Sequence, residues 1–164
     1  MSKKTRASAT PAIAVLDEQG VSYRLYEYEH DPDSELGFGL EGAAKLGISP
    51  VRVFKTLMVK VDGFLVTAVV PASGMLDLKA LAAAVHGKRA ELALPAEAER
   101  VTGYIVGGIS PLGQKRSHPT VIDQSAMDHD TILVSGGRRG MSLEVTAADL
   151  ARATGASFAA IGRG

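Results

Sequence analysis

The 164-residue sequence contains no cysteine. This absence excludes a disulfide scaffold, a thiolate nucleophile and cysteine-ligated zinc or iron–sulfur chemistry, and it agrees with a cytoplasmic protein. Metal-ligand spacings such as His-x-x-x-His are also missing among the four histidines, which are His30, His86, His118 and His129. The sequence therefore predicts no metal site and no cofactor.

Long apolar runs and an excess of one charge are equally absent. No apolar segment approaches the roughly 20 residues that a membrane-spanning helix needs, so a soluble protein without membrane contact is expected. Eighteen basic residues balance eighteen acidic ones. Because a domain that holds nucleic acid by itself normally carries a basic excess, any contact with RNA is expected to be local or assisted.

Three common catalytic signatures are missing as well. The chain has no Walker-type loop and no Gly-x-Gly-x-x-Gly after a strand, which argues against an NTPase or a dinucleotide enzyme. It also lacks a Gly-x-Ser-x-Gly elbow, and no nucleophile, base and orienting group form a recognisable set. Covalent catalysis by the protein is therefore not indicated.

The chain predicts a flexible tail over residues 1–9 and a single domain over residues 10–164. Helices and strands alternate irregularly, which favours a mixed α/β fold with a curved sheet or partial β-barrel surrounded by helices. Asp62-Gly63 between two apolar runs predicts a hairpin. Helices are expected at 11–19, 40–46, 78–85, 95–101 and 147–153, and strands at 23–28, 56–61, 64–70, 120–122, 131–134, 143–145 and 158–161.

Two glycine-rich loops are the most informative segments. In the first, Gly103–Gln114, a short apolar strand is expected to run into Gly107 and Gly108, followed by Ile109, Ser110 and a proline. The second, from Ser135 through Gly136 to Gly140, follows another apolar strand. Either loop alone is equally well explained as a simple turn or bulge. Together, with cations beside both, they predict the rims of a pocket whose backbone N–H groups hold a carbonyl oxygen or phosphate.

Lys55 lies in an otherwise apolar strand. Alternation places it on one face with Val53 and Leu57, so its ammonium group either extends to the rim or holds an anion in a pocket. Thr56 is expected on the opposite face, where it reaches the same ligand only through local distortion. Tyr28 fits either the core or a pocket wall, and Phe38, expected in a loop over residues 33–39, fits a pocket wall better.

Six segments form a distinctive ordered set: Thr10-Pro-Ala, Tyr28-Glu-His-Asp-Pro, Val53-Phe-Lys-Thr-Leu, Leu76-Asp-Leu-Lys, Thr102-Gly-Tyr-Ile-Val-Gly-Gly-Ile-Ser-Pro-Leu-Gly-Gln-Lys and Val134-Ser-Gly-Gly-Arg-Arg-Gly. In this order they resemble the YbaK family of free-standing aminoacyl-tRNA deacylases, and the resemblance extends from about Thr10 to Ala160. It implies a trans-editing enzyme that removes cysteine from proline-specific tRNA, with the aminoacylated 3′ end and prolyl-tRNA synthetase as partners. It also implies that the thiol of the substrate attacks the ester and leaves a cyclic thioester.

By position, the resemblance implies that Lys55 orients the terminal adenosine and phosphate and that Gly107 places its backbone near the scissile ester. Substrate-binding positions are expected at Tyr28, Phe38, Thr56, Gly108, Ile109, Ser110, Ser135 and Gly136. One departure is Ser142, which stands where close relatives carry an acidic residue; Glu144 is expected on the same strand face. Two alternatives stay open: a deacylase specific for alanine or of broad specificity, and a non-catalytic module that binds a nucleotide or acylated RNA.

Overall fold

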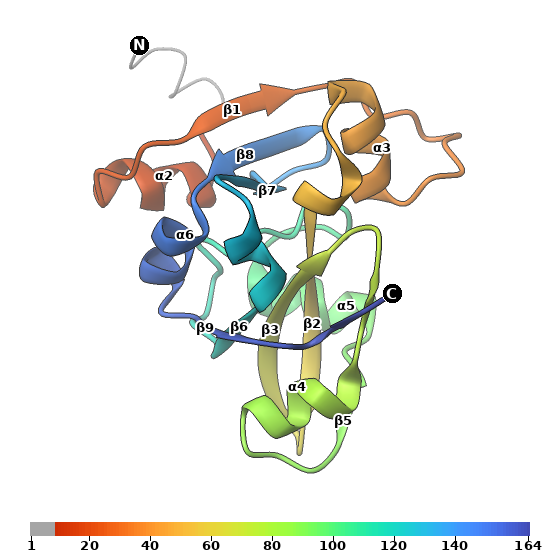
Figure 1. Ribbon diagram of the computed structural model, residues 1–164, viewed down its shortest axis with the longest axis vertical. Coiled ribbons are helices and arrows are strands. Elements are labelled where there is room, and N and C mark those ends of the chain that lie inside the picture. Colours follow the sequence, from red (N-terminus) through yellow and green to blue (C-terminus); the bar gives the residue numbers. More distant parts are fainter. Residues whose placement is uncertain (1–8) are drawn as a thin grey trace.

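The computed structural model describes residues 9–164 (Figure 1), so the tail predicted for residues 1–9 lies, apart from Ala9, outside the described residues. Four helices begin where the sequence predicts, at residues 11, 78, 95 and 147. In three of them a side-chain oxygen of Thr10, Asp77 or Thr146 accepts a hydrogen bond from a backbone N–H of the first turn, and the fourth begins with Pro95. The α-helices are α2 (Pro11–Glu18), α3 (Phe38–Leu46), α4 (Leu78–Ala84), α5 (Pro95–Thr102) and α6 (Ala147–Thr154), and the 3₁₀ turns are η1 (Pro50–Arg52) and η2 (Gln124–Asp128).

Most strands form two sheets. The larger has the order β5-β2-β3-β6-β9, with β2 antiparallel to β3 and β5, and β6 parallel to β3 and β9. The smaller is antiparallel, with the order β1-β8-β7, and a third pairing joins β4 to β10. The bounds are β1 (Arg24–Glu27), β2 (Phe54–Val61), β3 (Phe64–Pro71), β4 (Met75–Leu76), β5 (Ala90–Leu92), β6 (Thr120–Asp123), β7 (Ile132–Ser135), β8 (Met141–Val145), β9 (Ser157–Ala159) and β10 (Gly162–Arg163). The mixed α/β fold is confirmed, and the barrel does not close.

Both faces of the larger sheet are buried. Neighbouring residues such as Val69 and Val70 belong to different apolar clusters, as expected for side chains that alternate across a sheet. One cluster lies between this sheet, the smaller sheet and the helices α2 and α6. The other packs α4 and the buried Ile161 against the opposite face. Because apolar clusters cover both of its faces, the larger sheet holds the residues along its edges in defined positions.

Three expectations about elements were wrong. Residues 104–106 form no strand, because Gly103 ends α5 with a φ of 81° and the Tyr104 hydroxyl then donates to the Leu112 carbonyl at 2.6 Å. Phe38 is the first residue of α3 rather than part of a loop, because Gly37 serves as the N-cap. The strand expected at 158–161 ends at Ala159 in β9, and residues 160 and 161 connect it to β10, which pairs in a different sheet.

Candidate functional site

A cavity of about 500 Å³ lies where β2, the start of α3, the start of α5 and the two glycine loops meet. Its walls are mostly apolar, and six consecutive residues of one strand segment, 53–58, contribute to them. A strand with a partner on each side normally presents alternate residues to one pocket. The unbroken run indicates that the cavity follows an unpaired strand edge.

The pairing of β2 explains this open edge. Strand β5 pairs with β2 only over Val59–Val61, and a single bridge joins Val53 to Leu133. The edge of β2 between these two pairings is a gap without a partner strand. The Met58 carbonyl points towards β5, since it accepts from the Ala93 N–H at 2.9 Å. Because backbone groups alternate along a strand, the N–H and C=O of Thr56 point the same way, into the gap.

Lys55 and Thr56 point to opposite faces of β2, since they pair with Val70 and Val69 in an unbroken register. Both nevertheless line the cavity without any bulge, because the cavity wraps around the strand edge. The Lys55 ammonium group donates to the Gly74 carbonyl at 2.8 Å, and burial lowers the pKa of the lysine. The Thr56 hydroxyl is buried and has no hydrogen-bond partner among residues 9–164.

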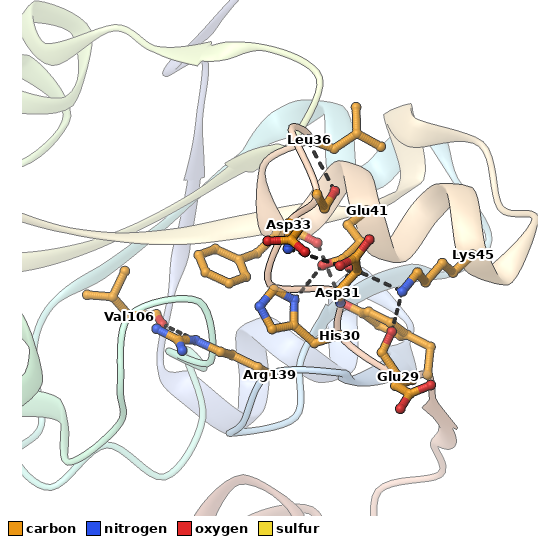
Figure 2. Close-up of polar contacts among 12 residues, drawn as sticks. Glu29, His30, Asp31, Asp33, Leu36, Glu41, Lys45, Val106 and Arg139 are labelled. Carbon is orange, nitrogen blue, oxygen red and sulfur yellow. Dashed lines mark hydrogen bonds and ion pairs between the residues drawn. The ribbon is translucent and has the colours of Figure 1, made fainter.

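The first glycine loop and Phe38 form the opposite wall. Gly107 has a φ of 92°, and a Cβ atom there would lie 2.7 Å from the Phe38 ring. The Arg139 guanidinium lies 5.1 Å from the centroid of that ring, and its Nε donates to the Val106 carbonyl at 2.9 Å. Figure 2 shows Arg139 reaching Val106 from the second loop. The structure thus brings the two loops together at this wall.

The start of α3 adds backbone donors to the cavity. Gly37, Phe38 and Gly39 line it, and N–H groups in the first turn of a helix have no acceptor within that helix. A Cβ atom at Gly39 would lie 2.7 Å from the Ala72 Cβ, so only glycine permits this close approach. These amides are suited to a carbonyl oxygen or an anion.

A buried carboxylate fixes the position of α3. Glu41 is 2% exposed, and it accepts hydrogen bonds from His30 Nδ1 and the Asp31 N–H, each at 2.7 Å, with Lys45 Nζ at 3.3 Å (Figure 2). Burial acts to raise the pKa of Glu41, but these hydrogen bonds outweigh it and hold the pKa below its ordinary value. The His30 ring also lies 5.2 Å from the Phe38 ring. Nothing in the sequence analysis identified Glu41, although Lys45 four residues later is a signal for an ion pair.

Seven of the ten predicted site residues line the cavity: Tyr28, Phe38, Lys55, Thr56, Gly107, Ile109 and Ser135. The other three lie behind its wall. Gly108 packs against the backbone of Arg138, and Ser110 is fully buried with its hydroxyl accepting from the Leu112 N–H. Gly136 donates to the Met141 carbonyl, inside the second loop. Leu92 of β5, the following Ala93, and Pro95 and Ala98 of α5 also line the cavity and were not predicted.

The departure at Ser142 also has a clear position. Ser142 lines the cavity, whereas Glu144 does not. The Glu144 carboxylate instead accepts hydrogen bonds from Arg52 at 2.9 Å, Tyr26 at 2.8 Å and Thr131. Glu144 therefore supplies no carboxylate to the cavity.

The sequence model of the aminoacyl-tRNA editing domain matches residues 40–153 of the chain. The chain belongs to this family. It is 37% identical over 163 residues to EbsC of Enterococcus faecalis, named as a Cys-tRNA(Pro)/Cys-tRNA(Cys) deacylase, with 98% of each chain covered. It is 31% identical over 145 residues to ProXp-y of Escherichia coli strain K12, named a multifunctional Ser/Thr-tRNA deacylase, with 85% of this chain and 84% of that one covered.

A solved structure described as a trans-editing enzyme for prolyl-tRNA synthetase has the same fold as this editing domain. The two superpose with a TM-score of 0.82 at 22% identity, over 94% of this chain and 96% of the other. Among the described residues of the editing domain, no group of three or more potential metal ligands occurs. No helix within residues 9–164 has the length and apolar character needed to cross a bilayer.

Proposed function

We propose that this protein is a trans-editing hydrolase that deacylates mischarged aminoacyl-tRNA, with Cys-tRNA(Pro) as its principal substrate. The observation that carries the proposal is the composition of one cavity. A partly buried ammonium group and an orphaned hydroxyl lie there beside the backbone of several glycines, and no cysteine lines it. The name of the Enterococcus relative supports cysteine as the amino acid that is removed.

This inventory suits the cleavage of an ester that is already activated. Lys55 binds the 3′-terminal adenosine and its phosphate, so that the aminoacyl ester lies along the open edge of β2. The Gly107 amide donates to the carbonyl oxygen as negative charge develops on it. Removing one such donor costs other enzymes about 3 kcal/mol of transition-state stabilisation, so well-aimed amides supply a large part of the required rate.

With a cysteinyl ester, the substrate provides the attacking atom. Its thiol sulfur forms a bond to the carbonyl carbon, the bond from that carbon to the ribose oxygen breaks, and the thiol proton passes to that ribose oxygen, which leaves as a free hydroxyl. The products are a cyclic thioester of cysteine and free tRNA, and water then opens the thioester. A protein without cysteine thus promotes thiol chemistry.

Deacylation of Cys-, Ala-, Ser- and Thr-tRNA by the purified protein tests this proposal. Lys55→Ala should abolish turnover while the protein stays folded. Lys60→Ala is the matched control, because Lys60 lies on the same strand, outside the cavity, and pairs with Glu97 at 3.0 Å. Preference for Ser- or Thr-tRNA, as the name of the Escherichia relative suggests, or for Ala-tRNA would replace cysteine as the substrate. No turnover with any of the four would leave a binding module.

We also propose that prolyl-tRNA synthetase presents the tRNA, because a chain of zero net charge gains little affinity from phosphate contacts alone. Deacylation of Cys-tRNA(Pro) should become more efficient when the synthetase is added, and deacylation of Cys-tRNA(Cys) should not. Equal efficiency with and without the synthetase would contradict this partner.

A further inference from the structure

The Lys55 ammonium group is held by a loop that is itself held by a distant strand. Its one hydrogen bond among the described residues goes to the Gly74 carbonyl, at 2.8 Å, and it forms no ion pair with a described carboxylate. Gly74 lies in the short connection between β3 and β4, after a turn in which its N–H donates to the Pro71 carbonyl. The position of this carbonyl therefore depends on what fixes the connection.

Strand β10 fixes it from the other side. Gly162 and Arg163 pair with Leu76 and Met75, and the Asp77 N–H donates to the Ile161 carbonyl at 2.7 Å. At Gly74 the two segments approach so closely that a Cβ atom would lie 2.7 Å from the Arg163 carbonyl oxygen. The backbone of β10 thus packs directly against the residue that binds Lys55.

A buried carboxylate anchors β10 in turn. Asp123, at the end of β6, is 7% exposed, and its Oδ1 accepts from the N–H groups of Ile161 at 2.9 Å and Gly162 at 2.8 Å. Burial acts to raise the pKa of Asp123, but hydrogen bonds from Ser125, Gly162 and Ile161 hold it below its ordinary value. The group is therefore a carboxylate at neutral pH and a strong acceptor for both amides.

We propose that Asp123 and strand β10 are positioning elements for the proposed catalytic lysine: they hold the Gly74 carbonyl, which aims the Lys55 ammonium group into the cavity. The inference rests on the proposed role of Lys55. It gives a part in the reaction to a buried carboxylate on β6 and to the backbone of β10, neither of which lines the cavity. Figure 1 shows the chain after β9 running across the sheet towards the end marked C.

Gly74→Ala tests the last link in this chain of contacts. The added methyl group should push the connection away from Arg163, and the φ of Gly74 lies outside the left-handed region, so the variant adds no backbone strain of its own. We expect kcat to fall about tenfold, as loss of one hydrogen bond to a charged group implies, with a smaller change in KM. Ser73→Ala is the matched control, because Ser73 is the exposed neighbour in the same turn.

The pKa of the Lys55 amine, followed by NMR titration without tRNA, is the deciding measurement. In Gly74→Ala it should fall if the ammonium stays buried without its acceptor, or rise towards 10.5 if the side chain escapes to water. An unchanged pKa would overturn the inference. Because no substrate is involved, a shifted pKa in a protein without deacylase activity would retain the positioning role and reject only the proposed function.

Asp123→Asn tests the first link from a distance. It weakens the two hydrogen bonds that the N–H groups of Ile161 and Gly162 donate to Oδ1, and it leaves Lys55 and Gly74 unchanged. A shift of the Lys55 pKa in this variant therefore shows coupling through β10. Ser125→Ala is its control, because it removes a partner of the other carboxylate oxygen and leaves Oδ1 in place. Equal Lys55 pKa values in Asp123→Asn and Ser125→Ala would contradict the coupling.

Discussion

Glu41→Gln replaces a buried carboxylate by an uncharged amide of nearly the same shape. In the folded protein this carboxylate accepts two hydrogen bonds of 2.7 Å, from His30 and from the Asp31 N–H, and pairs with Lys45. A glutamine presents one acceptor oxygen and turns an NH₂ group towards the other donor. The substitution therefore removes the charge from every contact, and only the His30 tautomer whose Nδ1 accepts can still bond to the NH₂ group.

The expected loss of stability follows from these contacts. A hydrogen bond to a charged group contributes about 1.5–3 kcal/mol, and the ion pair with the partly exposed Lys45 adds about 1 kcal/mol. We expect the free energy of unfolding at pH 7 to fall by about 2–4 kcal/mol, because two short charge-assisted bonds become weaker neutral ones and the ion pair is lost. The start of α3 should loosen with it, and the Phe38 wall of the cavity with α3.

The effect should depend on pH in a defined direction. The pKa of Glu41 in the folded protein lies below its ordinary value of 4.5, so its stabilising contribution is complete above about that pH. It disappears as the pH falls through the folded-state pKa, where the carboxylate takes up a proton. The difference in unfolding free energy between the wild type and Glu41→Gln should shrink below pH 4.5.

Urea denaturation of both proteins at pH 7 and at several values below pH 4.5 measures these quantities. Glu35→Gln is the control, because Glu35 is an exposed carboxylate in the loop before α3 and should change stability by less than about 0.5 kcal/mol. A Glu41→Gln protein as stable as the wild type at pH 7, or a difference that grows on acidification, would refute the reasoning.

Two further substitutions test the wall opposite β2. Gly107→Ala should lower kcat/KM for deacylation about 100-fold and the free energy of unfolding by about 1–2 kcal/mol. The reason is that a φ of 92° strains alanine and that the added methyl group meets the Phe38 ring. Near-normal kinetics would exclude a role for the Gly107 amide. Arg139→Ala should lower kcat/KM several-fold and destabilise the protein by under about 1 kcal/mol, since it frees the Phe38 ring and the Val106 carbonyl. The control Arg138→Ala should change neither kcat/KM nor stability, because Arg138 pairs with the exposed Glu27 instead. Equal effects of the two substitutions would contradict the contact of Arg139 with Phe38 and Val106.

The sequence predicted the elements whose signals are local. The hairpin at Asp62-Gly63 is confirmed because both residues adopt positive φ, 51° and 87°, as this turn requires. The helix that contains Phe38 begins earlier than expected, since Gly37 caps it without any side-chain signal. Strands β4, β5 and β10 have only two or three residues and depend on partners far along the chain, so no local pattern indicates them.

The site was predictable in its residue types and not in its geometry. Glycine pairs and a lysine in an apolar strand indicate amide donors and a cation; Lys55 and Gly107 do line one cavity, whereas Gly108 and Gly136 lie behind its wall. The carboxylate of Glu41 was missed because a glutamate within a helix normally faces water, and only the tertiary structure buries it. Strand alternation separates Lys55 from Thr56, and only the incomplete pairing of β2 explains why both face the cavity.

The gap in the pairing of β2 has a consequence for selectivity. Main-chain groups at Thr56 offer a donor and an acceptor to any ligand with a peptide-like amine and carbonyl, whatever its side chain. Discrimination among amino acids must then come from the shape and polarity of the surrounding surfaces, such as Phe38, Met58 and Ile109. Engineering that reshapes those surfaces should redirect the protein to other aminoacyl groups, while a common anchoring mode is retained.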